Sequence, residues 1–254
     1  MKKLLLALFL SLNFIGISQD KTIFSIHIVK VDGDLEAFEK VQKNYMQRVA
    51  KAAVEKGDIG FWAFLKFNHF DNVDNEERMN YAFIQNNKNI DAFFNEKNAW
   101  WNNASNVLSD SEQELVAALS KNFTWTKDGR HIFVEEAGIA KGLGRYIQFN
   151  FATPKNLQGF IDENNSLWKN FFNSNMSSMG MVNWGVGRRI APISNEWSSV
   201  VTWDMFNTLE ELMNFRVGFK LPSNIVNKSK MTEYNPSGWN SSQVLEVLAS
   251  SLEE

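Results

Sequence analysis

One stretch of the sequence combines small, polar and charged side chains in a pattern that could form a ligand site. It is Met181–Ile190, MVNWGVGRRI, whose residue types predict a strand. Side chains alternate along a strand, so one face would carry Asn183, Gly185, Gly187 and Arg189. Two glycines leave open space on that face, and an arginine beside the space could bind an anion.

The guanidinium of Arg189 would need a partner if this face is buried, because removing an isolated charge from water is costly. The strand predicted at Val200–Phe206 should pair with Met181–Ile190, and we expect its Asp204 to be that partner. With Trp184 or Trp203 at the rim, the pattern predicts a pocket. We expect it to favour a small ligand that carries a carboxylate or a carbonyl group.

An earlier predicted strand, Ile59–Phe67, has bulky residues on both faces. The two strands correspond, because Trp184 follows Trp62 by 122 positions. The same step relates five more pairs of similar residues: Leu35 and Leu157, Phe38 and Phe160, Lys66 and Arg188, Tyr81 and Trp203, and Phe93 and Phe215. This repetition predicts one structural unit that occurs twice. It leaves open whether aromatic side chains fill the space over the glycines, and the candidates are Phe171 and Phe172.

The predicted order of elements in each unit is strand, helix, two strands and a second helix. The first unit comprises Thr22–Val31, a helix from the N-cap Asp34 to Gly57, Ile59–Phe67, Met79–Gln85 and a helix over Asn89–Leu108. The second comprises Arg145–Phe151, a helix capped by Thr153 before Pro154, Met181–Ile190, Val200–Phe206 and a helix that starts with Leu209–Phe215.

Each unit lacks a closing strand. Phe123–Thr126 and His131–Glu135 flank an Asp128-Gly129 pair, which predicts a hairpin, and one of its strands would close the first unit. Gly138–Gly144 is expected to join the units flexibly. Gln243–Leu252 could be either a terminal helix or the last strand of the second unit.

A unit of this order, once closed by a strand, is ferredoxin-like. A tandem pair resembles the dimeric α+β barrel superfamily in its fused form, in which two sheets close against each other as a pseudo-dimer. The resemblance covers residues 22–220 and implies an α+β fold with two repeats, over residues 19–137 and 138–254. It implies no single activity, because that superfamily includes antibiotic-biosynthesis-type monooxygenases, EthD-like proteins and haem-binding chlorite dismutase relatives.

Cofactor and metal chemistry have little support. The resemblance to chlorite dismutase relatives implies a proximal histidine in the second repeat, yet the three histidines are His27, His69 and His131. These histidines do not have the spacing of metal ligands, and the acidic loop Asp71–Glu77 lacks the glycine of a calcium loop. The chain has no cysteine and no Gly-x-Ser-x-Gly motif for nucleophilic catalysis. We therefore expect neither a cofactor nor a metal.

The composition argues for a globular protein with a large core, since 44% of the residues are hydrophobic. A net charge of −3 gives no sign of a nucleic-acid surface. Trp100 and Trp101 are adjacent on a predicted helix, so one of them should point away from the core. Such a tryptophan could bind a sugar or another flat ligand, or contact a second copy in a homo-oligomer.

The sequence is compatible with three functions. The first is binding of a small ligand in a cavity of the second repeat. The second is a cofactor-free monooxygenase-like or isomerase-like enzyme, which an acid–base pair in the cavity would favour. The third is a surface interaction module with exposed aromatic side chains.

The N-terminus predicts export as a secreted or periplasmic protein. Residues 1–18 have a basic start, an apolar segment over Leu4–Ile17 and small residues at Gly16 and Ser18, as in a signal peptide. The apolar segment is short for a membrane anchor. We expect the mature chain to begin at or near Gln19. N-terminal sequencing of protein from the native host would test this, and an intact Met1 would contradict it.

Overall fold

The structure is a computed structural model that describes residues 21–71 and 77–252. The predicted signal peptide and part of the acidic loop lie outside these residues. Within the described chain, the strands form a closed antiparallel barrel in the order β1-β3-β2-β8-β5-β7-β6-β4. Their bounds are β1 Ile23–Gly33, β2 Phe61–Phe67, β3 Tyr81–Asn87, β4 Phe123–Ala140, β5 Tyr146–Ala152, β6 Met181–Ala191, β7 Val200–Phe206 and β8 Ser241–Ser250.

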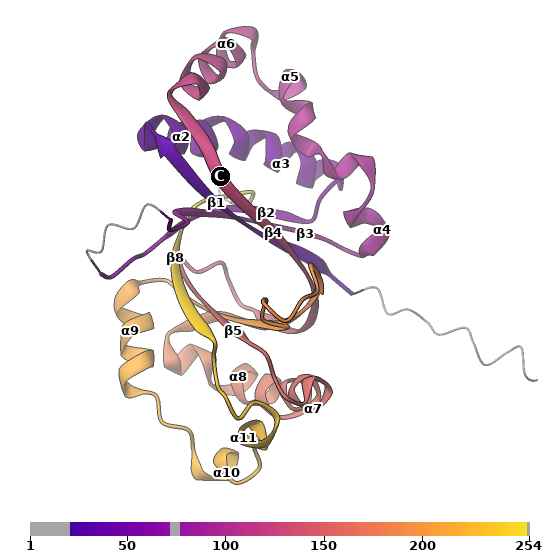
Figure 1. The fold of residues 1–254 in the computed structure, drawn as a ribbon, viewed down its shortest axis with the longest axis vertical. Coiled ribbons are helices and arrows are strands. Elements are labelled where there is room, and N and C mark those ends of the chain that lie inside the picture. The colour runs from indigo at the N-terminus through magenta and orange to yellow at the C-terminus, as the bar shows by residue number, and fades with distance from the viewer. Residues whose placement is uncertain (1–20, 72–76, 253–254) are drawn as a thin grey trace, which may run out of the picture.

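The helices cover the barrel on two opposite sides (Figure 1). One layer, from the N-terminal half, comprises α2 Leu35–Val41, α3 Gln47–Lys56, α4 Ile90–Phe93, α5 Ala104–Val107 and α6 Asp110–Leu119. The other layer comprises α7 Leu157–Glu163, α8 Lys169–Asn175, α9 Leu209–Gly218, α10 Ser223–Val226 and α11 Met231–Tyr234. One-turn π-helical segments, Gln42–Met46 and Asn164–Trp168, connect α2 to α3 and α7 to α8. Short 3-10 segments lie at Glu96–Asn98, Trp100–Asn103, Ser120–Asn122 and Met176–Met179.

Apolar side chains form three main clusters, because each strand has one face toward the barrel interior and one toward a helix layer. Phe38, Phe64 and Tyr81 are at the centre of the cluster under the N-terminal helices. Phe172, Trp184 and Phe206 belong to the cluster under the C-terminal helices. The third cluster fills the barrel interior with Phe24, Ile26, Ala63, Leu65, Ala82, Phe133, Ile147, Phe149, Val201, Met205, Leu245 and Val247.

The predicted ends of the first long helix are confirmed. The Asp34 side chain accepts a hydrogen bond from the backbone N–H of Ala37, as an N-cap does. Gly57 ends α3 in the left-handed conformation, with a φ of 76°. Gly33, with a φ of 96°, makes the turn from β1 into α2, and a Cβ there would lie 2.4 Å from the Asn122 carbonyl oxygen.

The predicted hairpin at Asp128-Gly129 is wrong. Phe123–Ala140 is one continuous strand, and Gly129 lies opposite Ile28 of β1. Because β1 is long enough to pair with this segment as far as Val134, a straight strand satisfies more backbone groups than a turn would. The continuation of β4 pairs with β6, so Gly138 is within a strand and is not part of a flexible join.

Two predicted helices also differ from the structure. The predicted helix Asn89–Leu108 is broken into short pieces, and the Asn95 side chain accepts a hydrogen bond from the Lys97 N–H at one break. Asparagine side chains compete with helical hydrogen bonds in this way. The helix predicted to start at Thr153-Pro154 instead begins after Asn156, whose side chain caps the N–H of Gly159.

The ambiguous C-terminal segment is a strand. Residues 241–250 form β8, which lies between β2 and β5 and so joins the first-half strands to the second-half strands. The second junction is the pairing of β4 with β6. These two junctions close the barrel.

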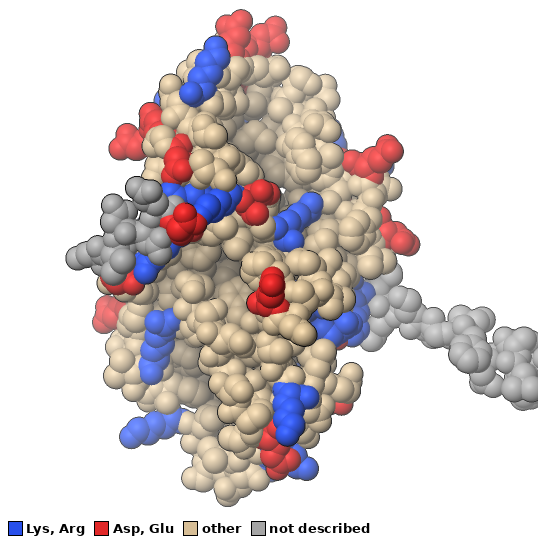
Figure 2. Space-filling view, viewed as in Figure 1, with Lys and Arg blue, Asp and Glu red and all other residues tan. Residues whose placement is uncertain are grey.

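No described helix combines the length and the hydropathy that crossing a bilayer requires. On the face shown in Figure 2, basic and acidic side chains are interspersed, and neither sign gathers over a broad region.

Candidate functional site

The four predicted site residues of β6 point into the barrel. Gly185 and Gly187 face the rings of the interior cluster, and Arg189 and Asn183 lie toward opposite ends of the strand. Trp184 points outward instead, and its ring lies 4.9 Å from that of Phe172 between centroids. The predicted alternation is therefore confirmed, and Trp184 belongs to the helix-covered core rather than to a pocket rim.

Aromatic rings occupy the space directly over both glycines. A Cβ at Gly185 would lie 2.0 Å from the Trp203 ring, and one at Gly187 would lie 2.5 Å from the Phe24 ring. Phe24 in turn contacts Phe133, with ring centroids 5.2 Å apart, and Trp203, at 5.3 Å. The fillers are strand residues from the barrel and not Phe171 and Phe172 of the helix layer. The predicted cavity is thus absent over the glycines, and open space remains at the two ends of the barrel.

Two cavities result, and we name each after its charged residue. The Arg189 cavity has a volume of about 850 Å³, and the Glu135 cavity has a volume of about 560 Å³. Phe149 lines both, so little more than one layer of rings separates them. Asn183 and Trp203 line the Glu135 cavity. The predicted site residues are therefore distributed over both ends of the barrel.

Arg189 is buried, with 8% of its surface exposed. Its guanidinium forms no ion pair with a carboxylate of the described residues. Its Nε donates to the carbonyl oxygen of Ser198 at 2.6 Å, and a terminal nitrogen donates to Nδ1 of His131. Its Cζ atom lies 4.8 Å from the ring centroid of Phe133 and 5.9 Å from that of Trp197. Burial lowers the pKa of Arg189 to about 10, which still leaves it charged at neutral pH.

His131 is a neutral neighbour of this charge. Burial, together with the smaller effects of the charges of Arg189 and His27, lowers its pKa to about 4. Because a guanidinium can only donate, Nδ1 of His131 accepts and Nε2 carries the proton. His131 therefore holds the guanidinium in place without adding a second buried charge.

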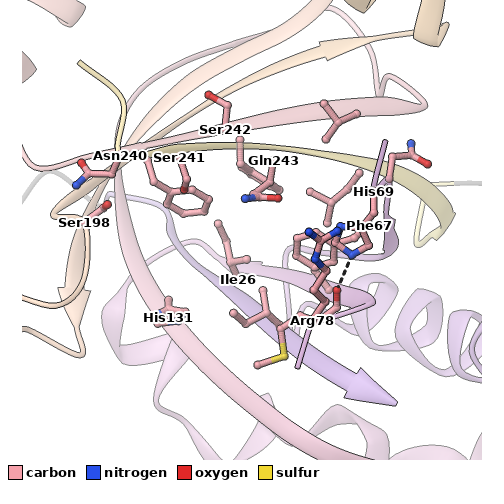
Figure 3. A pocket seen from close by; sticks show the side chains of 18 of the residues that line it. Ile26, Phe67, His69, Arg78, His131, Ser198, Asn240, Ser241, Ser242 and Gln243 are labelled. Carbon is pink, nitrogen blue, oxygen red and sulfur yellow. Dashed lines mark hydrogen bonds between the residues drawn. The ribbon is translucent and has the colours of Figure 1, made fainter. Parts of the chain in front are cut away.

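The remaining walls of the Arg189 cavity are apolar on the barrel side and polar near the start of β8. The apolar side chains include Ile26, Ile28, Ala82, Phe149, Phe151 and Leu245. In Figure 3, Asn240, Ser241, Ser242 and Gln243 lie along one side of the pocket, and His69 and Arg78 lie at another. Arg78 forms an ion pair with Asp71, so its charge already has a carboxylate partner. Arg216 also lines the cavity, but it is exposed and donates to Gln148. The cavity thus combines an apolar chamber with a buried cation, Arg189, that has no carboxylate partner among the described residues.

Asp204 does not meet Arg189, and this prediction is wrong. Asp204 is on the outward face of β7, opposite Trp184, where it is 6% exposed. It accepts hydrogen bonds from Asn150 Nδ2 at 2.9 Å and from Gln148 Nε2 at 3.4 Å. Burial raises the pKa of Asp204 to about 6, although these two bonds oppose the shift. Asp204 therefore belongs to a polar cluster under the C-terminal helices.

Sequence reasoning missed His131, because it placed this residue on a hairpin. In the structure β4 pairs with both β1 and β6, which brings residues 58 positions apart into contact. The signal that existed was the two-residue spacing of His131 and Phe133 within a predicted strand. This spacing placed both side chains on one face of the strand, but it did not show which strand lies beside it.

A third cavity, the aromatic pocket, has a volume of about 500 Å³ and lies between the outer face of the first-half strands and their helices. Aromatic side chains that line it are Trp62, Phe83, Trp100, Trp101, Phe123 and Trp125. Trp100 is buried and Trp101 is 48% exposed, as their adjacency predicted. His27 lines the pocket, and its Nε2 lies 3.0 Å from Oδ2 of Asp128.

The comparisons with known proteins concern the fold. No family profile matches the chain, and no curated protein matches its sequence. A candidate monooxygenase of Fusobacterium nucleatum subsp. nucleatum has a TM-score of 0.50 and 9% identity, over 91% of this chain and 94% of that one. A candidate monooxygenase of Lactobacillus acidophilus has a TM-score of 0.49 and 13% identity, over 91% and 94%. A chlorite dismutase variant of Candidatus Nitrospira defluvii has a TM-score of 0.43 and 9% identity, over 91% and 92%. In its fold, this chain resembles the dimeric α+β barrel superfamily.

The residues of the C-terminal half do not fit a haem. The sequence has no histidine after His131. The space between the C-terminal helices and their strands is packed with Phe171, Phe172, Met176 and Trp184. Among the described residues, no group of three or more His, Cys, Asp or Glu side chains could hold a metal ion.

We expect replacement of Gly187 by leucine to destabilise the fold by about 1–3 kcal/mol, because the new side chain must displace the Phe24 ring in a packed interior. Urea denaturation of purified protein measures this. The matched control is Gly218→Leu at the end of α9, where no atom lies within 4 Å of the added Cβ. Equal stability of the two variants would contradict the described packing.

Proposed function

We propose that this protein binds a small molecule with a carboxylate and an apolar body in the Arg189 cavity. The observation that carries the proposal is the buried guanidinium of Arg189, which faces the largest of the described cavities without a carboxylate partner. A buried charge is stable only when it is paired or well hydrogen-bonded. A ligand carboxylate supplies the missing partner.

The guanidinium geometry suits this role. Arginine has five N–H donors, and the described contacts engage its Nε and one terminal nitrogen. The rings of Phe133 and Trp197 fix the guanidinium, so that little side-chain freedom is lost on binding. Donors that remain can hold a carboxylate through charge-assisted hydrogen bonds.

The cavity also suits the apolar part of such a ligand. Its volume of about 850 Å³ falls within the range of small-molecule sites. Ile26, Phe149 and Leu245 provide an apolar wall, and the start of β8 provides hydroxyl and amide groups. Two acidic residues line the cavity, Asp71 and Glu196. Asp71 forms an ion pair with Arg78, and Glu196 lies on an exposed loop and forms no ion pair with Arg189.

We expect Arg189→Met to weaken the binding of a carboxylate by about 10- to 100-fold, the loss typical of one charge-assisted hydrogen-bonding group. Isothermal titration calorimetry with decanoate, 3-phenylpropionate and their primary amides measures the effect. The amides test the charge, because they keep the apolar body. Arg48→Met is the matched control, since Arg48 forms a surface ion pair with Glu112 in the helix layer. Equal affinities of acid and amide for the unmodified protein would overturn the proposal.

The second candidate function is proton-transfer catalysis in the aromatic pocket. The specific observation is the His27–Asp128 pair, in which the carboxylate orients the imidazole and leaves its other ring nitrogen for a substrate. The Trp125 ring lies 5.6 Å from that of His27, and further tryptophans line the pocket. This suits a planar aromatic compound with an acidic hydroxyl group. The description of the Fusobacterium nucleatum protein as a candidate monooxygenase is compatible with an enzyme on this fold, although the likeness itself concerns the fold.

We expect His27→Gln to abolish ionisation of a bound phenol without abolishing its binding, because the aromatic walls remain. The ionised fraction of 2-naphthol, read from its absorption spectrum at saturating protein, measures proton transfer, and tryptophan fluorescence measures binding. His69→Gln is the matched control, since His69 lies outside the aromatic pocket. An unchanged ionised fraction in His27→Gln would exclude His27 as the base.

We also infer that the barrel arose from two ferredoxin-like repeats, over residues 19–137 and 138–254. The strand orders β4-β1-β3-β2 and β8-β5-β7-β6 support this, because each has the same sequence of connections. Trp62 and Trp184 both pack outward, as the step of 122 positions predicted. The correspondence of residues 122 positions apart fails at Tyr81 and Trp203, because Tyr81 faces the helices and Trp203 faces the barrel interior.

We also propose that residues 1–18 direct export of the protein.

A further inference from the structure

Glu135 is a carboxylate that points into the barrel from an irregular part of β4. It lies opposite Gly187, and the register of β4 against β6 shifts between Glu135 and Ala137. The shift is a β-bulge, which re-aims side chains. Glu135 precedes this bulge and points inward, like Phe133 two positions earlier, whereas Glu136 points outward to Arg188 and Lys21. Two adjacent glutamates thus have opposite environments.

The position of the Glu135 carboxylate depends on Gly138. A Cβ at residue 138 would lie 2.3 Å from Oε1 of Glu135, which no real pair of atoms tolerates. Gly138 pairs with Gly185 of β6, whose own missing side chain makes room for Trp203. The glycines therefore leave space for one carboxylate and one indole at this end of the barrel.

Within the described chain, the Glu135 carboxylate has neither a hydrogen bond nor an ion pair, in contrast to Glu136. Burial raises the pKa of Glu135, and the charge of Lys169 on α8 opposes this shift without forming an ion pair. No lysine, arginine or histidine is among the residues that line the Glu135 cavity. The cavity therefore contains an acidic group but no cation to match it.

The other walls of this cavity are mainly apolar and aromatic. Phe24, Phe61 and Trp203 contribute rings, and Ile84 and Met205 contribute aliphatic surface. The polar side chains are Asn86 and Asn183, and Asn183 already accepts a hydrogen bond from Trp203 Nε1 at 2.9 Å. Aromatic faces attract cations as well as apolar groups. Both the carboxylate and its surroundings thus favour a cation with an apolar body.

We propose that the Glu135 cavity is a second binding site, which takes a small amine with an apolar or aromatic body. The ammonium group pairs with the Glu135 carboxylate, and the body packs against Phe61 and Trp203. This site is at the opposite end of the barrel from Arg189, so it does not depend on the function proposed for that residue. The interior then has a cation-binding end and an anion-binding end, separated by the rings of Phe24 and Phe133.

Calorimetry with 2-phenylethylamine and 2-phenylethanol tests the proposal, since the two compounds differ in the charged group and share the body. We expect the amine to bind at least about tenfold more tightly than the alcohol, as for a hydrogen bond to a charged group. Glu135→Gln should remove this preference and leave the alcohol unaffected. Gly138→Ala should also weaken amine binding, because the added Cβ displaces the carboxylate.

Two controls separate this site from the Arg189 cavity. Arg189→Met should leave amine binding unchanged, and Glu135→Gln should leave the binding of 3-phenylpropionate unchanged. Thermal denaturation establishes that each variant is folded, and Glu135→Asp serves if Glu135→Gln does not fold, with weakened amine binding expected for the shorter side chain. Equal binding of amine and alcohol to the unmodified protein, no binding of either, or full amine affinity in the folded Glu135 variant would each overturn the proposal.

Discussion

The constraint on which the rest of the structure depends is closure of the strands into one ring. Once closed, the barrel confines every second side chain of each strand to a narrow interior, where large groups fit only opposite small ones. Gly185 and Gly187 are the small positions, and Trp203 and Phe24 are the large groups that use their space. The resulting layer of rings stabilises the barrel and also divides its interior into two chambers.

The two chambers differ in charge because different residues lie at the two ends of β4 and β6. His131 and Arg189 lie toward one end, and Glu135 and Gly138 lie toward the other. A cation without a carboxylate and a carboxylate without a cation are both unfavourable in a folded interior unless something compensates them. Ligands of opposite charge provide one consistent account of both observations.

The likeness to solved structures concerns the fold and does not indicate which ligand or reaction belongs to this chain. A candidate monooxygenase shares the fold at 9% sequence identity. In the present chain, the helix-covered space of the C-terminal half is packed with aromatic and methionine side chains, whereas that of the N-terminal half contains an open aromatic pocket. The difference shows why function must be argued from each site and not from the shared architecture.

The sequence by itself determined the elements that depend on local chemistry. The Asp34 cap, the left-handed Gly57 and the alternation that turns Arg189 inward and Trp184 outward all follow from residue type and short-range geometry. The overall α+β barrel resemblance followed from the order of those elements.

Only the tertiary structure decided which strands are neighbours and where the registers shift. Asp128-Gly129 has the composition of a turn, yet pairing with β1 keeps it extended. Asp204 was expected beside Arg189, but register places it opposite Trp184 on the other face of the sheet. The contact of Arg189 with His131 and the surroundings of the Glu135 carboxylate depend on the pairing of β4 with β6. Such long-range pairings have no local signature, because they are fixed by barrel closure and not by neighbouring residues in the chain.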